Sequence, residues 1–206
     1  MKLIVAAMVE EVAGFTTEPL ETDTLIPLDF SESYLLVTGI GKVNAAASLA
    51  RAIALHNVER IYNFGFVGAT SPYAIHDLVV VEEASYHDFD LSLFGYAKGQ
   101  VPGYPPVFPS DAVLLEEVYD RLKAIPTGRL YTGDIFMTDK RADAYLADME
   151  GAALYQVARR YGIPIVAIKV VSDVIGSKDH NEQFQSFDAE RGMQALKRSC
   201  IRILGG

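Results

Sequence analysis

Cysteine is nearly absent from this chain, and its scarcity excludes two kinds of structure. Cys200 is the only cysteine among the 206 residues, so no disulfide can form within one chain. A zinc site built on two or more cysteines of one chain is excluded for the same reason. The four histidines are scattered, without a pair at the spacing that places two ligands on one helix face. The sequence therefore predicts neither a metal site nor any other cofactor.

Basic runs and long apolar runs are also missing. The formal net charge is −9, whereas nucleic acids and anionic membranes favour clustered lysine and arginine. Each apolar stretch is too short to span a bilayer. The apolar start resembles a signal peptide, but Glu10 and Glu11 interrupt it where a cleavage region would follow. We therefore expect a soluble cytoplasmic protein that binds neither nucleic acid nor membrane.

The composition is that of a globular chain with a sizeable core, with 50% hydrophobic and 22% charged residues. Apolar strand-like runs alternate with helical patterns, which indicates an α/β architecture. No repeat or flexible linker divides residues 1–206, so a single domain is expected. Strands are expected at Lys2–Met8, Ser33–Thr38, Arg60–Phe64, Leu78–Glu82 and Ile165–Val171. Helices are expected at Val43–His56, Val113–Ala124, Met149–Tyr161 and Asp188–Leu204. The proline-rich segment Pro102–Pro109 is expected to form a long structured loop.

The segment Ile165–Ile175 carries the strongest chemical signal. Its apolar run is typical of a parallel strand that is covered on both faces, and it ends in the polar pair Ser172 and Asp173. Burial weakens the hydration of a charged carboxylate, so we expect Asp173 to retain a proton and to suit general-acid catalysis. The alternative is that Asp173 only caps the next helix.

Other carboxylates follow a strand or begin a helix. Glu10 and Glu11 come after the first strand, at the edge where open α/β sheets place their ligands; alternatively, they are first-turn charges that the helix dipole favours. Glu150 can accept hydrogen bonds from two neighbouring ribose hydroxyls, or can simply favour a helix start. Together, Glu11, Glu150 and Asp173 resemble a site that cleaves a glycosidic bond with an acid on one side and a water on the other.

Two glycine-containing turns and one aromatic residue add to this pattern. Gly39-Ile-Gly41 allows the backbone to approach a ligand, but Asn44 stands where a dinucleotide-binding motif has its third glycine. Gly65–Gly68 is expected to be a similar turn, or a point of tight packing between strand and helix. Phe136 is suited either to stacking on a base or to the core.

The motifs in their order resemble those of the 5′-methylthioadenosine/S-adenosylhomocysteine nucleosidases, within the purine nucleoside phosphorylase superfamily. The matching segments are Ala7–Val12, Gly39–Val43, Tyr86–Asp90, Phe94–Gly103, Gly133–Phe136, Asp148–Glu150 and Ser172–Asp173. The resemblance implies a three-layer αβα fold with a mixed, mostly parallel, twisted sheet flanked by helices. It also implies hydrolysis of the N-glycosidic bond to give adenine and a 5-thioribose, in methionine salvage and without a cofactor.

The resemblance further implies a role for each matching residue. Asp173, held by Ser172, would protonate N7 of adenine, and Glu11 would activate the attacking water. Glu150 would hold the ribose hydroxyls. The remaining contacts implied are Met149 and Met8 with the sugar, Phe136 and the Met137 backbone with adenine, and Ile40 with the 5′ pocket.

Two further features are implied by the same resemblance. The loop of Phe94 and Pro102 would complete the 5′ pocket of a neighbouring subunit, which implies a homodimer. An aromatic residue late in the chain would close the site; we expect Phe187, with Phe184 as the alternative.

The chain departs from the family pattern at two positions. Phe66 stands where the family has a small hydroxyl residue, and Lys169 stands where it has an arginine. Both positions normally help to hold the catalytic water. Lysine keeps the charge but lacks the fork of donors that arginine has.

Three other functions compete with this hypothesis. A phosphorolytic enzyme would need arginines near its glycine-rich turns, and neither Gly39–Gly41 nor Gly65–Gly68 contains one. A hydrolase of another purine nucleoside, such as futalosine, is a nearer alternative. Phe66 and Lys169 motivate a third, a non-catalytic nucleoside-binding protein, but pure binding would not require a poised acid.

Overall fold

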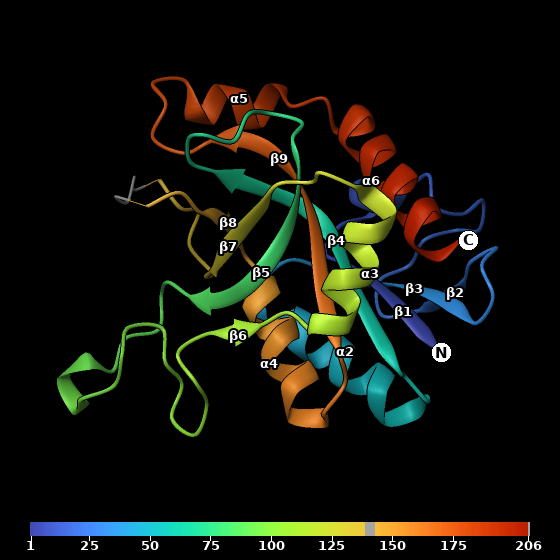
Figure 1. Cartoon of the computed structure of the whole chain (residues 1–206), viewed down its shortest axis with the longest axis horizontal. Coiled ribbons are helices and arrows are strands. Elements are labelled where there is room, and N and C mark those ends of the chain that lie inside the picture. The colour runs from blue at the N-terminus through green and yellow to red at the C-terminus, as the bar shows by residue number, and fades with distance from the viewer. Residues whose placement is uncertain (139–142, 206) are drawn as a thin grey trace.

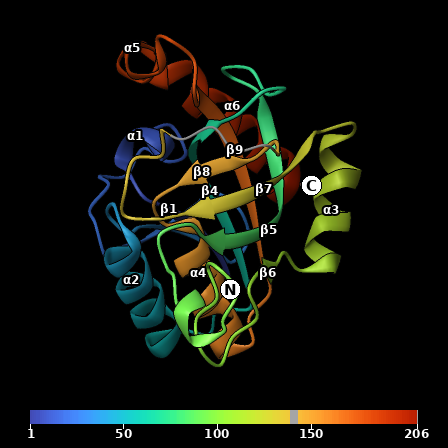
Figure 2. The ribbon, with the colours of Figure 1, turned by 90° about the vertical axis from the view of Figure 1, so that its left-hand side faces the viewer.

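The chain folds into one mixed β-sheet between two layers of helices, seen from two sides in Figures 1 and 2. The structure is a computed structural model that describes residues 1–138 and 143–205. The strands are β1 (Lys2–Ala6), β2 (Leu25–Pro27), β3 (Ser33–Val37), β4 (Arg60–Ala69), β5 (Leu78–Tyr86), β6 (Phe108–Pro109), β7 (Thr127–Thr132), β8 (Leu146–Asp148) and β9 (Ile165–Val174). The helices are α1 (Val9–Val12), α2 (Lys42–Leu55), α3 (Ala112–Leu122), α4 (Gly151–Tyr161), α5 (His180–Ser186) and α6 (Ala189–Leu204), with a short 3₁₀ helix η1 (Ser92–Phe94).

The carboxyl ends of several parallel strands meet at one edge of the sheet. β1 pairs in parallel with β3 and β4, and β4 pairs in parallel with β9 over nearly its whole length. The carboxyl ends of β1, β4 and β9 therefore lie at the same edge. Near that edge, β8 pairs with the last residues of β4 and also with β7, which brings a further strand end to the same place.

The hydrophobic core forms on both faces of the sheet because the side chains of each strand alternate between the faces. On one face, Leu3 and Val5 of β1 pack with Leu49 of α2 and Ala152 of α4. On the other face, Ile4 packs with buried residues of α3 and α6, among them Leu114, Val118, Leu196 and Cys200. The three-layer αβα fold that the resemblance implied is thereby confirmed.

The expected strands and helices are all present, but three strands run further than expected. β5 continues to Tyr86, β4 continues to Ala69, and β9 continues to Val174. Gly65–Gly68 is therefore part of β4 and forms no turn, so that expectation was wrong. Ser172 and Asp173 likewise lie within β9, and α5 begins only at His180, so the helix-cap alternative for Asp173 is not what the structure has.

A long loop between β5 and β6 extends from the body of the molecule (Figure 1, green). It contains η1, and it places Leu93 and Phe94 in solvent with 90% and 72% of their surfaces exposed. None of the described helices combines the length and the apolar character that crossing a membrane requires.

Candidate active site

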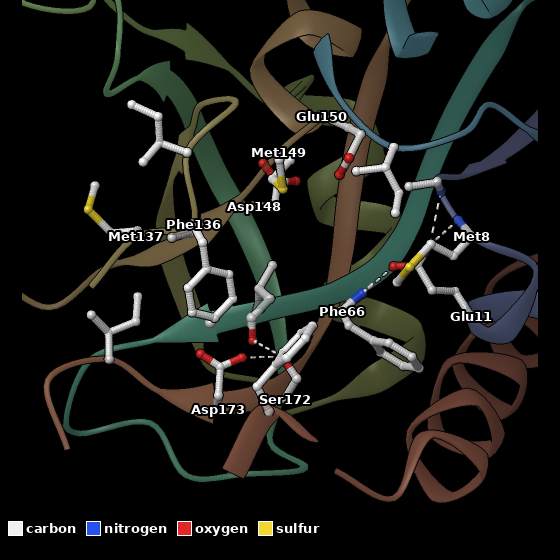
Figure 3. A pocket seen from close by; sticks show the side chains of 18 residues that line it. Met8, Glu11, Phe66, Phe136, Met137, Asp148, Met149, Glu150, Ser172 and Asp173 are labelled. Atoms are coloured by element: carbon white, nitrogen blue, oxygen red, sulfur yellow. Dashed lines mark hydrogen bonds between the residues drawn. The ribbon is translucent and has the colours of Figure 1, made fainter. Parts of the chain in front are cut away.

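A pocket opens at the edge where β1, β4 and β9 end (Figure 3). This is the edge at which open α/β sheets bind ligands. The lining comes from β4, β8, β9, α1 and α5 and from the segments after β1, β3, β7, β8 and β9. It consists of Ala7, Met8, Glu11, Ile40, Phe66, Val67, Gly68, Ile135, Phe136, Met137, Ala147, Asp148, Met149, Glu150, Ser172, Asp173, Ile175 and Phe184.

Asp173 is the most enclosed acid on the β9 side of the pocket, with 2% of its surface exposed. Its Oδ1 lies 2.6 Å from Oγ of Ser172, and its Oδ2 lies 2.6 Å from Nε2 of His180. Oγ of Ser172 also lies 3.0 Å from the carbonyl oxygen of Val67 on β4. Ser172 thus connects the carboxyl group of Asp173 to the neighbouring strand.

Both oxygens of the Asp173 carboxyl group have a hydrogen-bond partner. The hydroxyl group of Ser172 donates to Oδ1 of Asp173 and can alternatively donate to the carbonyl oxygen of Val67. The ring of His180 donates to Oδ2 in the tautomer that carries its hydrogen on Nε2. The carboxyl group is thus fixed in orientation, and it lines the pocket, where it can exchange a proton with a ligand.

Glu11 lies on the opposite side of the pocket, in α1, and is also buried. Its Oε2 accepts hydrogen bonds from the backbone N–H groups of Ala7 and Met8, each at 2.9 Å, and its Oε1 accepts one from Phe66 at 2.8 Å. Burial raises the pKa of Glu11, while the positive charge of Lys169 and the three N–H donors oppose that rise. The donors fix the orientation of the carboxyl group, which can then act as a base.

Lys169 forms a buried ion pair with Asp148, with 3.0 Å between Nζ and Oδ2. The side chains are only 3% and 2% exposed. Asp148 is held by two more groups, because it accepts hydrogen bonds from Oγ1 of Thr132 at 2.6 Å and from the Gly151 backbone. The charge of Lys169 is therefore balanced directly by Asp148, a residue to which the sequence reasoning gave no role.

Glu150 lies at the start of α4 and faces the turn after β3. Its Oε1 accepts a hydrogen bond of 2.7 Å from the backbone of Gly41, whose φ of +95° is one that glycine adopts without strain. Burial and the nearby negative charge of Asp148 raise the pKa of Glu150 to about 7. Its other oxygen remains available to accept hydrogen bonds from a ligand.

Two glycines of β4 provide the space that two of these carboxyl groups occupy. A Cβ atom added to Gly65 would lie 2.8 Å from Oε1 of Glu11 and 3.2 Å from Nζ of Lys169. A Cβ atom added to Gly68 would lie 2.7 Å from Oδ2 of Asp173. Gly65 and Gly68 thus allow the carboxyl groups of Glu11 and Asp173 to approach strand β4 closely. The sequence had suggested a turn at this segment instead.

Apolar side chains form the walls between these acids. The predicted contacts Met8, Ile40, Phe136, Met137 and Met149 all line the pocket together with the carboxyl groups, and Figure 3 shows four of them around it. Phe136 presents an aromatic face that is 42% exposed. The structure thus brings these five residues together around one pocket.

Four predicted site residues lie outside the lining of this pocket: Lys169, whose ion pair is described above, Phe187, Phe94 and Pro102. The centroid of the Phe187 ring lies 4.9 Å from that of Phe66 and 5.0 Å from that of His76, and Phe187 does not line the pocket. Phe184 of α5, the alternative, does line the pocket, because α5 begins seven residues after Asp173 and carries Phe184 towards Phe136. Phe94 and Pro102 are exposed on the β5–β6 loop and belong to no lining of this chain's pocket.

Phe66 contributes its backbone, not its side chain, to the acid groups. Its N–H group donates to Glu11, while its ring extends the other way, towards Phe187 and Gly192 (Figure 3). The side chain of Phe66 therefore offers no hydrogen bond to a ligand beside Glu11.

His180 is the contacting residue that sequence reasoning missed. In the sequence it was one of four scattered histidines, in a polar segment with no strong helical periodicity. In the structure it is 7% exposed and opens α5 directly against Asp173. The only sequence signal was its position seven residues after a proposed catalytic acid, which does not by itself indicate contact.

The charges around the pocket are mostly negative. Four carboxylic residues line it, and no arginine is among the described lining residues. Over residues 1–138 and 143–205, no three histidine, cysteine or acidic side chains are grouped so as to hold a metal ion. An acidic pocket with apolar walls favours an uncharged organic ligand with hydroxyl groups over a phosphate anion.

Comparison with known proteins connects this pocket to a family. The model of the phosphorylase superfamily matches residues 3–204. A 5′-methylthioadenosine/S-adenosylhomocysteine nucleosidase of Bacillus cereus is 35% identical over 208 aligned positions, which cover 89% of this chain and 90% of that protein.

Solved structures are similar over nearly the whole chain. A 5′-methylthioadenosine/S-adenosylhomocysteine nucleosidase of Colwellia psychrerythraea in complex with adenine is 30% identical, with a TM-score of 0.86, covering 99% of this chain and 94% of that one. A futalosine hydrolase of Helicobacter pylori has a TM-score of 0.85 at 23% identity, covering 98% and 96%. At that identity the second likeness shows the fold alone.

Proposed function

The chain belongs to the phosphorylase superfamily, and from that premise we propose how its pocket cleaves a nucleoside. The reaction is hydrolysis of the N-glycosidic bond of 5′-methylthioadenosine or S-adenosylhomocysteine, with release of adenine, as in the nucleosidases to which the chain is similar. The observation that carries the proposal is the placement of two buried carboxyl groups across one pocket, Asp173 held by Ser172 and His180, and Glu11 held by three backbone N–H groups.

The acid acts on the leaving base. Asp173 gives its proton to N7 of adenine, so the electron pair of the C1′–N9 bond can leave with a base that ends neutral. Phe136 stacks on the ring system, and the backbone of Met137 binds its edge. These apolar neighbours exclude water, which strengthens the hydrogen bond between the acid and the base.

Glu11 acts as the general base towards water. As the glycosidic bond lengthens, the ribose gains positive charge, and Glu11 removes a proton from the water that attacks C1′. Glu150 accepts hydrogen bonds from the ribose hydroxyls, with Met8 and Met149 against the sugar and Ile40 at its 5′ side. Lys169, paired with Asp148, moderates the negative charge around Glu11 and Glu150. Exchange with solvent then returns a proton to Asp173 and removes one from Glu11.

Closure of the site falls to Phe184. It lines the pocket, and its ring contacts that of Phe136 at 5.2 Å in an edge-to-face arrangement. Because 51% of its surface is exposed, Phe184 has room to move onto a bound nucleoside.

A homodimer completes the 5′ pocket in this proposal. Phe94 and Leu93 are apolar, highly exposed and unable to reach this chain's own pocket lining. A second exposed apolar surface includes Val43 of α2, beside a groove between α2 and α4 that contains Ala46, Ala47 and Val157. Contact between two copies would bury both surfaces and place each loop at the partner's pocket. We place the reaction in the cytoplasm and in methionine salvage.

The experiment that tests the function measures the free base. Purified protein is incubated with methylthioadenosine, adenosylhomocysteine, inosine and futalosine, each with and without phosphate. We expect adenine from the first two substrates, at rates that do not depend on phosphate. A strict requirement for phosphate would indicate a phosphorylase, preference for futalosine would indicate the other hydrolase, and binding without turnover would indicate a nucleoside-binding protein.

A further inference from the structure

His180 contacts Asp173 and Phe136, the residues proposed to protonate adenine and to stack on it, although His180 itself does not line the pocket. Its Nε2 lies 2.6 Å from Oδ2 of Asp173. Its ring is stacked on that of Phe136, with 5.2 Å between the centroids and 26° between the planes. His180 is 7% exposed and is absent from the pocket lining, so it lies behind these two groups.

We propose that His180 is a positioning residue that donates a hydrogen bond to Asp173 as the proton leaves for the base. This inference rests on the proposed function, because it assumes that Asp173 is the acid. In the protonated state, Oδ2 is the carbonyl-like oxygen of a neutral acid and accepts from Nε2–H. Once the proton has moved to N7, the same Nε2–H group donates to a carboxylate.

The bond is stronger after proton transfer than before it. Hydrogen bonds to a charged acceptor are roughly twice as strong as those between neutral groups. An interaction that strengthens as charge develops lowers the barrier, whereas equal stabilisation of both states would not. His180 therefore contributes to the rate of the chemical step rather than to the affinity for substrate.

Ser172 supports the same change of charge from the other side. Its Oγ lies within reach of both Val67 O, at 3.0 Å, and Asp173 Oδ1, at 2.6 Å. The single hydroxyl hydrogen points to Val67 while Asp173 is protonated, and it can turn to Oδ1 when Asp173 is ionised. After proton transfer the carboxylate then accepts one hydrogen bond on each oxygen, from Ser172 and from His180.

Stacking and hydrogen bonding by His180 can be separated by two substitutions. His180→Phe keeps an aromatic ring against Phe136 but removes the donor. His180→Gln keeps an amide N–H near the position of Nε2 but removes the ring. His56→Phe, at an exposed position after α2, is the matched control.

For His180→Phe we expect kcat to fall by about 10-fold to 100-fold, the range set by the loss of one hydrogen bond to a charged group. Its Kd for adenine, measured by calorimetry, should stay within about 3-fold of the unsubstituted protein, because stacking persists. His180→Gln should recover most of kcat and bind adenine more weakly. His56→Phe should change neither value. Thermal unfolding of each variant checks that it is folded.

Several outcomes would overturn the proposal. An unchanged kcat in a folded His180→Phe protein would show that the hydrogen bond does not serve catalysis. Equal losses of kcat in the Phe and Gln variants would indicate a purely structural role. Tighter adenine binding by both variants would mean that His180 competes with the base. These failures are distinct from failure of the proposed function, in which the unsubstituted protein itself would release no base from any nucleoside.

Discussion

Asp173 is buried and has a hydrogen-bond partner on each carboxyl oxygen. Substitution of this residue therefore tests its proposed role as the acid. Asp173→Asn keeps the size of the side chain but has no acidic proton to give to N7. We expect turnover to fall by about 10²-fold to 10⁴-fold, the usual range for loss of a general acid. Adenine binding should be largely kept, because the amide fits the same space.

Single-turnover release of adenine and calorimetric binding measure these two effects. Asp29→Asn, at an exposed position, is a suitable control for loss of one negative charge. Near-normal turnover in a folded Asp173→Asn protein would remove Asp173 from the mechanism.

Glu150 makes the stability of the protein depend on pH. Its pKa is about 7 in the folded state, against 4.5 for an ordinary glutamate. Between these values the folded protein holds a proton that the unfolded chain releases, so stability falls as pH rises through this window. The full effect is on the order of 3 kcal/mol, present below about pH 4.5 and lost as the pH passes 7.

Glu150→Gln removes this titration. Relative to the unsubstituted protein, the variant should gain stability between pH 5 and pH 8, because it never buries a charge at this position. Each kcal/mol corresponds to about 2–4 °C in Tm for a chain of this size. Thermal unfolding of both proteins across that pH range measures the difference, and parallel curves would contradict the assigned shift.

At the scale of single residues, the sequence pointed to most of the side chains that line the pocket. Glu11 and Glu150 were recognisable because each comes between a strand and a helix, and Ser172 and Asp173 because they come at the carboxyl end of a buried strand, which is where α/β sheets bind ligands. His180 was not recognisable, because its contact with Asp173 depends on the path of the chain between β9 and α5. The same path sets which aromatic residue lines the pocket, and in the structure that residue is Phe184 rather than Phe187.

At the scale of secondary-structure elements, strand β4 provides space for the carboxyl groups of both Glu11 and Asp173. Gly65 adjoins Glu11 and Lys169, and Gly68, three residues later, adjoins Asp173. Both glycines are needed for space, since neither has a positive φ. A side chain at either position would push a carboxyl group away from the strand.

Gly65→Ala tests this role of β4. The added Cβ would meet Oε1 of Glu11 at 2.8 Å, and the backbone donors of Glu11 leave it little freedom to move. We expect kcat to fall by about 10-fold or more, because misplacing a catalytic group by a fraction of an ångström costs rate. Gly14→Ala is the control, since its Cβ would meet the flexible side chains of Met193 and Lys197 and no carboxyl group. Equal activity of the two variants would show that β4 tolerates the extra atom.

Sequence patterns predicted the elements with continuous apolar runs and missed those without them. β1, β3, β4, β5 and β9 were found because each is buried and rich in branched apolar residues. β7 was missed because its buried positions are Gly128, Leu130 and Thr132, so alternation is present but hydrophobicity is weak. β8 has only three residues and α5 is mostly polar, so neither shows a periodicity that a sequence can display.

At the scale of the whole molecule, we propose that part of the 5′ pocket comes from the loop of Phe94 and Pro102 in a neighbouring copy. If a second copy supplies it, Phe94→Ala should raise KM for methylthioadenosine by about 10-fold, which corresponds to about 1.4 kcal/mol of binding. The value of kcat should change little, because Phe94 is remote from the acids of its own chain.

Mixing two inactive or weakened proteins tests whether the loop acts across subunits. Asp173→Asn subunits have an intact loop, and Phe94→Ala subunits have an intact acid. Mixed dimers would therefore contain one complete site, and at low substrate concentration the mixture should exceed the summed activities of the separate proteins. Sedimentation velocity reports the oligomeric state. A purely monomeric protein, or strictly additive activities, would contradict the shared site.

The position of Cys200 has a practical consequence. It is 1% exposed within the layer of α3 and α6, and burial raises its pKa to about 12, so its thiol is scarcely reactive near neutral pH. A cysteine introduced as Leu93→Cys at the exposed end of the β5–β6 loop would be the sole accessible thiol. A fluorophore or spin label attached there would report the movement and the neighbours of that loop in real time, without background signal from the native sulfur.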